Sequence, residues 1–75
     1  MQLSDAVDTI EYKIATESDS FEAGRTIRMD VNYNWPPIGE LSDALSRKHP
    51  HISVSYDHQP NDVVQLVIVN RRAAS

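Results

Sequence analysis

The sequence contains no cysteine, so neither disulfide bonds nor a thiolate metal site can stabilise the fold. It has only two glycines, too few for a glycine-rich phosphate-binding loop. No apolar run is long enough to cross a membrane, and the N-terminus carries acids where a signal peptide would have a basic flank. Because a protein without cysteine is compatible with a reducing cytosol, we expect a cytoplasmic location.

The 75 residues allow one domain with a small core, because chains of this length bury only about 60% of the surface that they expose when unfolded. The apolar fraction of 40% and the charged fraction of 24% are typical of a folded chain. We expect residues 1–72 to form a single small α+β domain and residues 73–75 to be a disordered tail. Since the sequence starts at Met1, we interpret it as a whole small gene product.

The one dense apolar run, VVQLVIV at residues 63–69, predicts the strand around which the fold is organised. Strand alternation would place Val63, Val67 and Val69 on one face and the remaining apolar residues on the other. The turn-forming segment HQPND at residues 58–62 precedes it. This segment predicts a C-terminal antiparallel hairpin with a strand over residues 51–57.

The preceding chain predicts one further strand and two helices. Alternating apolar residues indicate a strand over residues 25–33, and the prolines that follow Trp35 end it. An apolar stripe then predicts a helix over residues 38–48. The first segment has apolar residues at helical spacing, namely Leu3, Val7, Ile10 and Ile14. We expect a helix over residues 4–17, with a strand over residues 9–17 as the alternative.

The predicted order is therefore α-β-α-β-β, or β-β-α-β-β if the first segment is extended. Residues 18–24 are expected to form a polar connection with one buried side chain, Phe21. This order indicates an α+β fold, a two-layer α/β sandwich with a three- or four-stranded sheet covered on one face.

No motif fixes a chemical reaction. A metal site needs several ligands around one ion, whereas His51 and His58 would lie roughly 23 Å apart on an extended strand. The carboxylate pairs Asp5/Asp8 and Glu40/Asp43 occupy early helical turns, where acids favour the helix dipole. A chain this short is also expected to lack a pocket of a few hundred cubic ångströms. We therefore expect no enzyme activity, no cofactor and no metal.

The charge is unevenly distributed. Residues 1–43 hold nine acids against three basic residues, whereas residues 44–75 hold two acids against four basic residues. Arg71 and Arg72, with Arg47 and Lys48, could form a basic end that binds phosphates. A nucleic-acid-binding protein using this C-terminal end is therefore one alternative, although the net charge of −4 is unlike the usual basic footprint.

The leading hypothesis is a small non-enzymatic regulator that binds a larger protein partner and inhibits it; small regulators of this kind are often encoded by viruses and mobile elements. Tyr and Trp in a connection make good interface anchors, and one face of the central strand would stay uncovered. The backbone edge of that strand offers strand addition as a second route. A structural homodimer is the third possibility. The residues expected to bind the partner are Tyr33, Trp35, Val63, Val67, Val69, Arg71 and Arg72.

Overall fold

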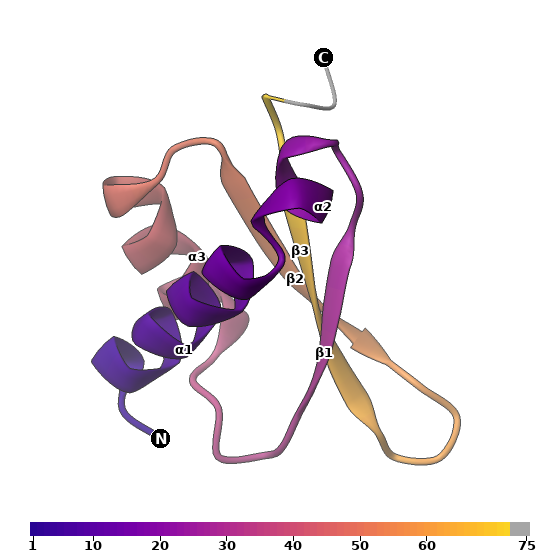
Figure 1. Ribbon diagram of the computed structural model, residues 1–75. Helices are drawn as coiled ribbons and strands as arrows, with labels where there is room; N and C mark the ends of the chain where they lie inside the picture. The colour runs from indigo at the N-terminus through magenta and orange to yellow at the C-terminus, as the bar shows by residue number, and fades with distance from the viewer. Residues whose placement is uncertain (73–75) are drawn as a thin grey trace.

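The computed structural model describes residues 1–72, and the expected tail over residues 73–75 lies outside the described residues. It confirms the α+β class and the C-terminal hairpin (Figure 1). The elements are α1 (Leu3–Thr16), α2 (Ser18–Glu22), β1 (Ile27–Val31), α3 (Ile38–Lys48), β2 (Ile52–His58) and β3 (Val64–Asn70). The first segment is therefore the expected helix rather than the alternative strand.

The sheet has the strand order β1-β3-β2, and both pairs are antiparallel. Val67 of β3 lies between Arg28 of β1 and Ser55 of β2. The central strand is thus the apolar run that the sequence marks. The expectation that this strand offers a free backbone edge is wrong, because both of its edges are paired. The free edges belong to β1 and β2.

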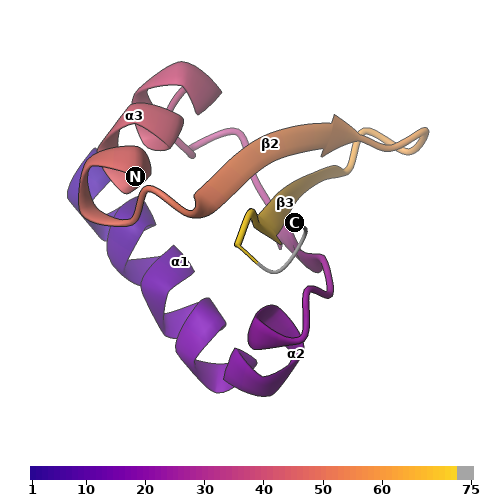
Figure 2. The same cartoon turned by 90° about the horizontal axis from the view of Figure 1, so that it is seen from above.

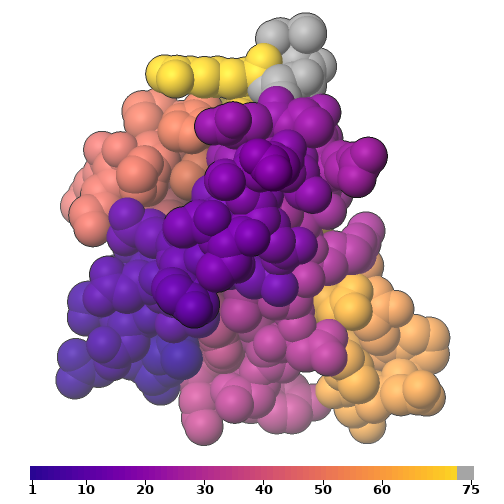
Figure 3. All heavy atoms as spheres, viewed as in Figure 1, coloured from indigo at the N-terminus to yellow at the C-terminus, as the bar shows by residue number. Residues whose placement is uncertain are grey.

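The three helices of residues 1–72 lie on one side of the sheet, as the view from above shows (Figure 2). Leu66 and Ile68 of β3 point into this layer and are fully buried. The largest other fully buried side chains come from the helices and are Ile10, Leu41 and Leu45. The two layers share one hydrophobic core, and the helix layer does not extend to the tip of the β2–β3 hairpin (Figure 3).

The connection over residues 18–24 contains a short helix, α2, that the sequence did not predict. Phe21 is 4% exposed and anchors this helix in the core. The N–H of Arg25 donates to the carbonyl of Ser20, and the N–H of Gly24 donates to that of Phe21. Gly24 has φ 87°, so this is a Schellman ending that favours glycine. A helix of one turn with one apolar residue leaves no periodicity to detect.

The hydrogen bonds of the hairpin fix which backbone groups face the neighbouring strand. Gln59 N–H donates to the Val63 carbonyl and Arg71 N–H donates to the His51 carbonyl, each at 2.7 Å. In an antiparallel pair, hydrogen-bonded and non-hydrogen-bonded residue pairs alternate. With the observed register, the odd-numbered residues of β2 bond to β3, and the even-numbered residues direct their N–H and C=O groups outward.

This alternation predicts the amide exchange of β2 in the free protein. The amides of Ser55 and Asp57 should exchange slowly, because they are bonded to β3. Those of Val54, Tyr56 and His58 should exchange faster, because they point to the free edge. Residue-resolved hydrogen exchange by NMR measures both sets. Equal protection along β2 would contradict the deduced ladder.

Candidate functional site

The residues expected to bind a partner lie in three separate places. Tyr33 and Trp35 occupy the β1–α3 connection, and Val63 lies in the hairpin loop just before β3. Val67 and Val69 lie on the face of the sheet opposite the helices. The remaining two, Arg71 and Arg72, follow β3 at the other end of that strand. The structure therefore does not bring the expected set together into one surface.

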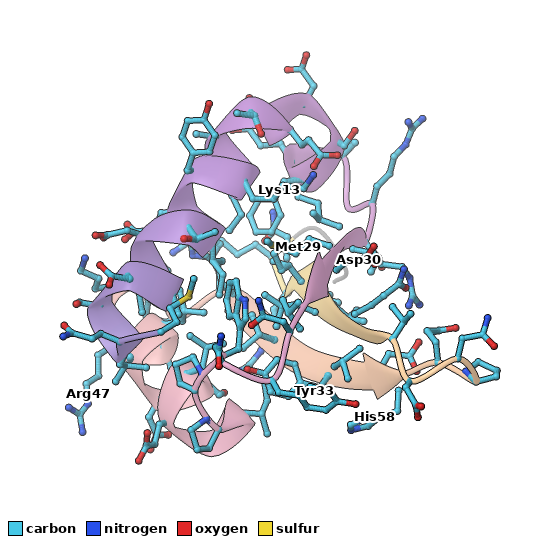
Figure 4. The ribbon with its side chains drawn as sticks, turned by 90° about the horizontal axis from the view of Figure 1, so that it is seen from below. Lys13, Met29, Asp30, Tyr33, Arg47 and His58 are labelled. Atoms are coloured by element: carbon cyan, nitrogen blue, oxygen red, sulfur yellow. The ribbon has the colours of Figure 1, made fainter. Side chains whose placement is uncertain are left out.

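One end of the sheet carries a hollow of about 260 Å³, which we call the aromatic groove. It is lined by Val31, Asn32, Tyr33, Trp35, Pro36, Pro37, Tyr56, His58 and Val64. Tyr33 is 83% exposed, the largest exposed fraction among the large hydrophobic side chains. Figure 4 shows Tyr33 and His58 on the same side of the molecule. The groove unites both aromatic anchors expected from the sequence with strand residues that the sequence did not single out.

The groove forms where the helix layer ends and the sheet continues. Val31, Val64 and His58 form the last row across the three strands. The β1–α3 connection lies beside this row, and Trp35 packs half-buried against the core. Trp35 therefore forms a wall of the groove and also partly covers the core.

Hydrogen bonds hold the wall of the groove in place. The Tyr56 hydroxyl donates to the Pro36 carbonyl at 2.5 Å. Asn34 N–H donates to Asn32 Oδ1 at 3.0 Å, and Trp35 N–H donates to the Asn32 carbonyl at 3.3 Å. Burial raises the pKa of the Tyr56 hydroxyl, which stays a neutral donor at physiological pH. The groove is thus preformed rather than assembled by a flexible loop.

The chain segments around the groove hold more acids than bases, and the positive charges at its margin are Arg28, which is paired with Asp57, and the Met1 ammonium, which donates to the Asn34 carbonyl. Neither residues 29–46 nor residues 49–70 contain lysine or arginine. Together these segments contain five acids, namely Asp30, Glu40, Asp43, Asp57 and Asp62. The surroundings of the groove therefore favour a basic ligand over an acidic one.

The open face of the sheet is mostly polar. The Arg28 guanidinium donates to Asp57 at 3.0 Å and spans from β1 to β2 across the central strand. Gln65 donates to Asp30 at 3.2 Å. Val67 and Val69 are half-buried among such neighbours. An antiparallel sheet with one solvated face has this pattern, so these valines give less support to an interface than the sequence alone indicated.

A second hollow of about 470 Å³, which we call the histidine cleft, lies between α1, α2 and the adjacent ends of β2 and β3. The expectation that the chain is too short for such a pocket is wrong. Phe21, Ile14 and Ile52 supply apolar lining, and His49 and His51 lie edge to face with ring centroids 6.1 Å apart. Among residues 1–72, no group of three or more metal-ligating side chains is placed to hold an ion.

The basic end of the chain is partly neutralised at this cleft. Glu11 accepts from His49 at 3.0 Å and from Lys48 at 3.3 Å. The hydrogen bond from His49 lowers the pKa of the Glu11 carboxyl below its ordinary value of 4.5, and Lys48 adds to this effect. Arg71 and Arg72 lie at the same end, since Arg71 bonds to the backbone of His51. The acid on α1 weakens the phosphate-binding interpretation of this end.

Comparisons with protein-family models, with curated proteins and with solved structures give no match for this chain. Among residues 1–72, no helix is long and apolar enough to span a membrane.

Glu11→Gln should lower the free energy of unfolding at pH 7 by about 0.2–1 kcal/mol, the range for solvent-exposed ion pairs. Because the folded-state pKa of Glu11 lies below the unfolded value, its contribution is present above pH 4.5 and is lost as the pH falls through the folded pKa. Urea unfolding at pH 7 and at pH 3 measures the difference. Asp8→Asn on the same helix is the control, and an equal loss at both pH values would contradict the assignment.

Tyr56→Phe removes the hydroxyl that holds the groove wall and should cost about 1 kcal/mol of unfolding free energy. Trp35 is the only tryptophan, so its fluorescence reports the wall directly. We expect a red shift of its emission, because a looser connection exposes the indole to water. Tyr12→Phe, at a 73% exposed position on α1, should change neither quantity. An unchanged Tyr56→Phe variant would show that the hydroxyl does not fix the groove.

Proposed function

We propose that this chain is a small non-enzymatic protein that binds a larger protein through the aromatic groove and inhibits it by occupying its surface. The observation that carries the proposal is Tyr33, a large aromatic side chain 83% exposed beside a preformed apolar hollow. Aromatic side chains next to a hollow are the usual centres of binding energy in protein interfaces.

Preorganisation supports the same conclusion. The hydrogen bonds at Asn32 and Pro36 hold the connection that carries Tyr33 and Trp35. A wall that is already ordered loses little conformational entropy when a partner binds. A tyrosine adds contact area with few rotatable bonds. These features suit a docking surface better than they suit a flexible connection between two elements.

The regulatory part of the proposal follows from size and chemistry. The sequence offers no nucleophile elbow and no phosphate loop. A chain of 75 residues that binds a larger protein changes its activity most directly by covering a surface that another molecule needs. We therefore propose that it blocks a site on its partner.

Tyr33→Ala tests the proposal against its competitors. In affinity capture from a lysate, the wild type should retain a specific protein, and Tyr33→Ala should weaken the binding of that protein by more than about tenfold. The matched control is Tyr12→Ala, which removes an exposed tyrosine from a distant helix. Nuclease treatment should change nothing, and the complex should survive an increase in salt, since apolar contacts release few counterions.

A different result identifies the alternative. Nucleic-acid binding would replace the proposal if nuclease abolishes the capture. It would also replace the proposal if Arg71→Ala/Arg72→Ala abolishes the capture and Tyr33→Ala does not. Sedimentation of the pure protein over a concentration range addresses the homodimer. A stable dimer that Tyr33→Ala dissociates would assign the groove to a second copy of the chain and contradict the proposed partner.

A further inference from the structure

Resting on the proposed function, we infer that the partner presents an extended basic segment that adds to the sheet as a fourth strand along the free edge of β2. Strand addition uses main-chain hydrogen bonds for affinity and alternate side chains for specificity. In this protein the edge and the aromatic groove are contiguous. Three features of β2 support strand addition: its free backbone edge, the lack of residues that prevent pairing with another strand, and the charge around it.

The free edge is defined by the ladder of the hairpin. Val54, Tyr56 and His58 turn their N–H and C=O groups away from β3. The N–H of Ile52 also points outward, but it donates to the His49 carbonyl at 3.0 Å. The view from above shows β2 at one margin of the sheet, with α3 packed beside it in the helix layer (Figure 2). The outward-facing backbone groups that are not bonded to β3 therefore run from Val54, which is 8% exposed, through the half-buried Tyr56 to the exposed His58.

The edge of β2 lacks the usual protection against pairing. Natural edge strands are commonly short, or carry lysine, proline or a bulge that prevents association. β1, the other edge, is only five residues long and carries Arg28 and Asp30 at its outward positions. β2 has seven residues without lysine, arginine or proline, and its register with β3 is continuous. Of the two free edges, β2 is the one suited to strand addition.

The edge and the groove share two residues. Tyr56 and His58 direct their backbone groups to the edge and also line the groove. A strand paired with β2 would place alternate side chains on the same side of the sheet as Tyr56. One such side chain would then lie next to the groove and could contact Tyr33 or Trp35. The backbone and the aromatic anchors would thus bind the same segment.

Charge selects the occupant of this edge. The groove lining and β2 contain no lysine or arginine. The acid of β2, Asp57, is paired with Arg28, and the flanking segments hold four more acids, namely Asp30, Glu40, Asp43 and Asp62. A second copy of the chain would bring the same acids against themselves, and each copy has a net charge of −4. A segment with lysine or arginine among apolar residues complements this surface. The structure therefore favours a basic partner segment over self-association.

Selection from a display library of short random peptides, with the purified full chain as bait, supplies the probe. We expect the recovered peptides to alternate apolar residues with lysine or arginine and to lack internal proline. On binding, the amides of Val54, Tyr56 and His58 should exchange at least about tenfold more slowly. N-methylation of alternate peptide residues, which removes edge-facing donors, should weaken binding by about tenfold, and methylation of their neighbours should not.

A matched pair of variants tests the edge from the protein side. His58→Pro removes the imidazole and the outward N–H, whereas His58→Ala removes only the imidazole. Proline is tolerated at such a non-bonded edge position, so the β2–β3 ladder should remain. Because both variants lose the imidazole that lines the groove, His58→Ala is the reference, and we expect His58→Pro to bind the selected peptide about tenfold more weakly than His58→Ala.

The outcomes separate the two proposals. Suppose that peptide binding is lost with Tyr33→Ala, but that the bound peptide leaves the amide exchange of Val54 and His58 unchanged and still binds when N-methylated. This result would overturn strand addition and leave the groove function intact. Recovery of no peptide, or binding indifferent to Tyr33→Ala, would overturn both. If His58→Pro does not fold, the N-methylated peptides decide. Edge protection in the peptide-free protein, rising with its concentration, would assign the edge to a second copy and overturn the inference.

Discussion

The pairing of β3 on both of its edges is the constraint on which the rest of this structure depends. It places the apolar run of the sequence at the centre of the sheet, where Leu66 and Ile68 meet the only helix layer among the described residues. Three strands then leave two free edges, and one helix layer leaves one open face and one uncovered end. The groove, the open face and the free edges follow from this arrangement, whereas the histidine cleft forms between α1, α2 and the adjacent strand ends. The core uses the centre of the sheet, and the surfaces available for binding lie at its margins.

The spacing of apolar residues along the chain was enough to predict most of the helices and strands. The helix over residues 38–48 appears with the bounds that its apolar stripe predicts, and the hairpin strands begin and end within one residue of expectation. The first helix was also expected from its helical spacing, and the structure excludes the strand that the alternation of its residues allowed. Strand order could not be predicted, since it depends on contacts between distant segments. That order alone explains why the expected free edge of the central strand does not exist.

Only the part of the groove that lies in the β1–α3 connection was predictable from the sequence. Tyr33 and Trp35 stand out in a proline-bounded connection, but Tyr56 and His58 join them only through the strand order. The sequence alone made the valines of the open face look like a stronger interface than the structure supports, for a related reason. The ion pair between Arg28 and Asp57 joins β1 to β2 across these valines, and nothing in the sequence links those two charges. The histidine cleft was missed because Phe21 and α2 create one of its walls. In each case the missing information is long-range rather than local.

The two ends of the molecule differ in how they can be reached. The ammonium group of Met1 donates to the carbonyl of Asn34 at 2.7 Å, in the connection that forms a wall of the groove. Residues 70–72 lie at the opposite end of the sheet (Figure 1). A fused domain, dye or resin attached at Met1 would replace this charged donor by an amide and add bulk beside Tyr33. Attachment beyond residue 72 would leave the groove facing outward. The orientation in which the protein is tethered therefore determines which end a binding assay can sample.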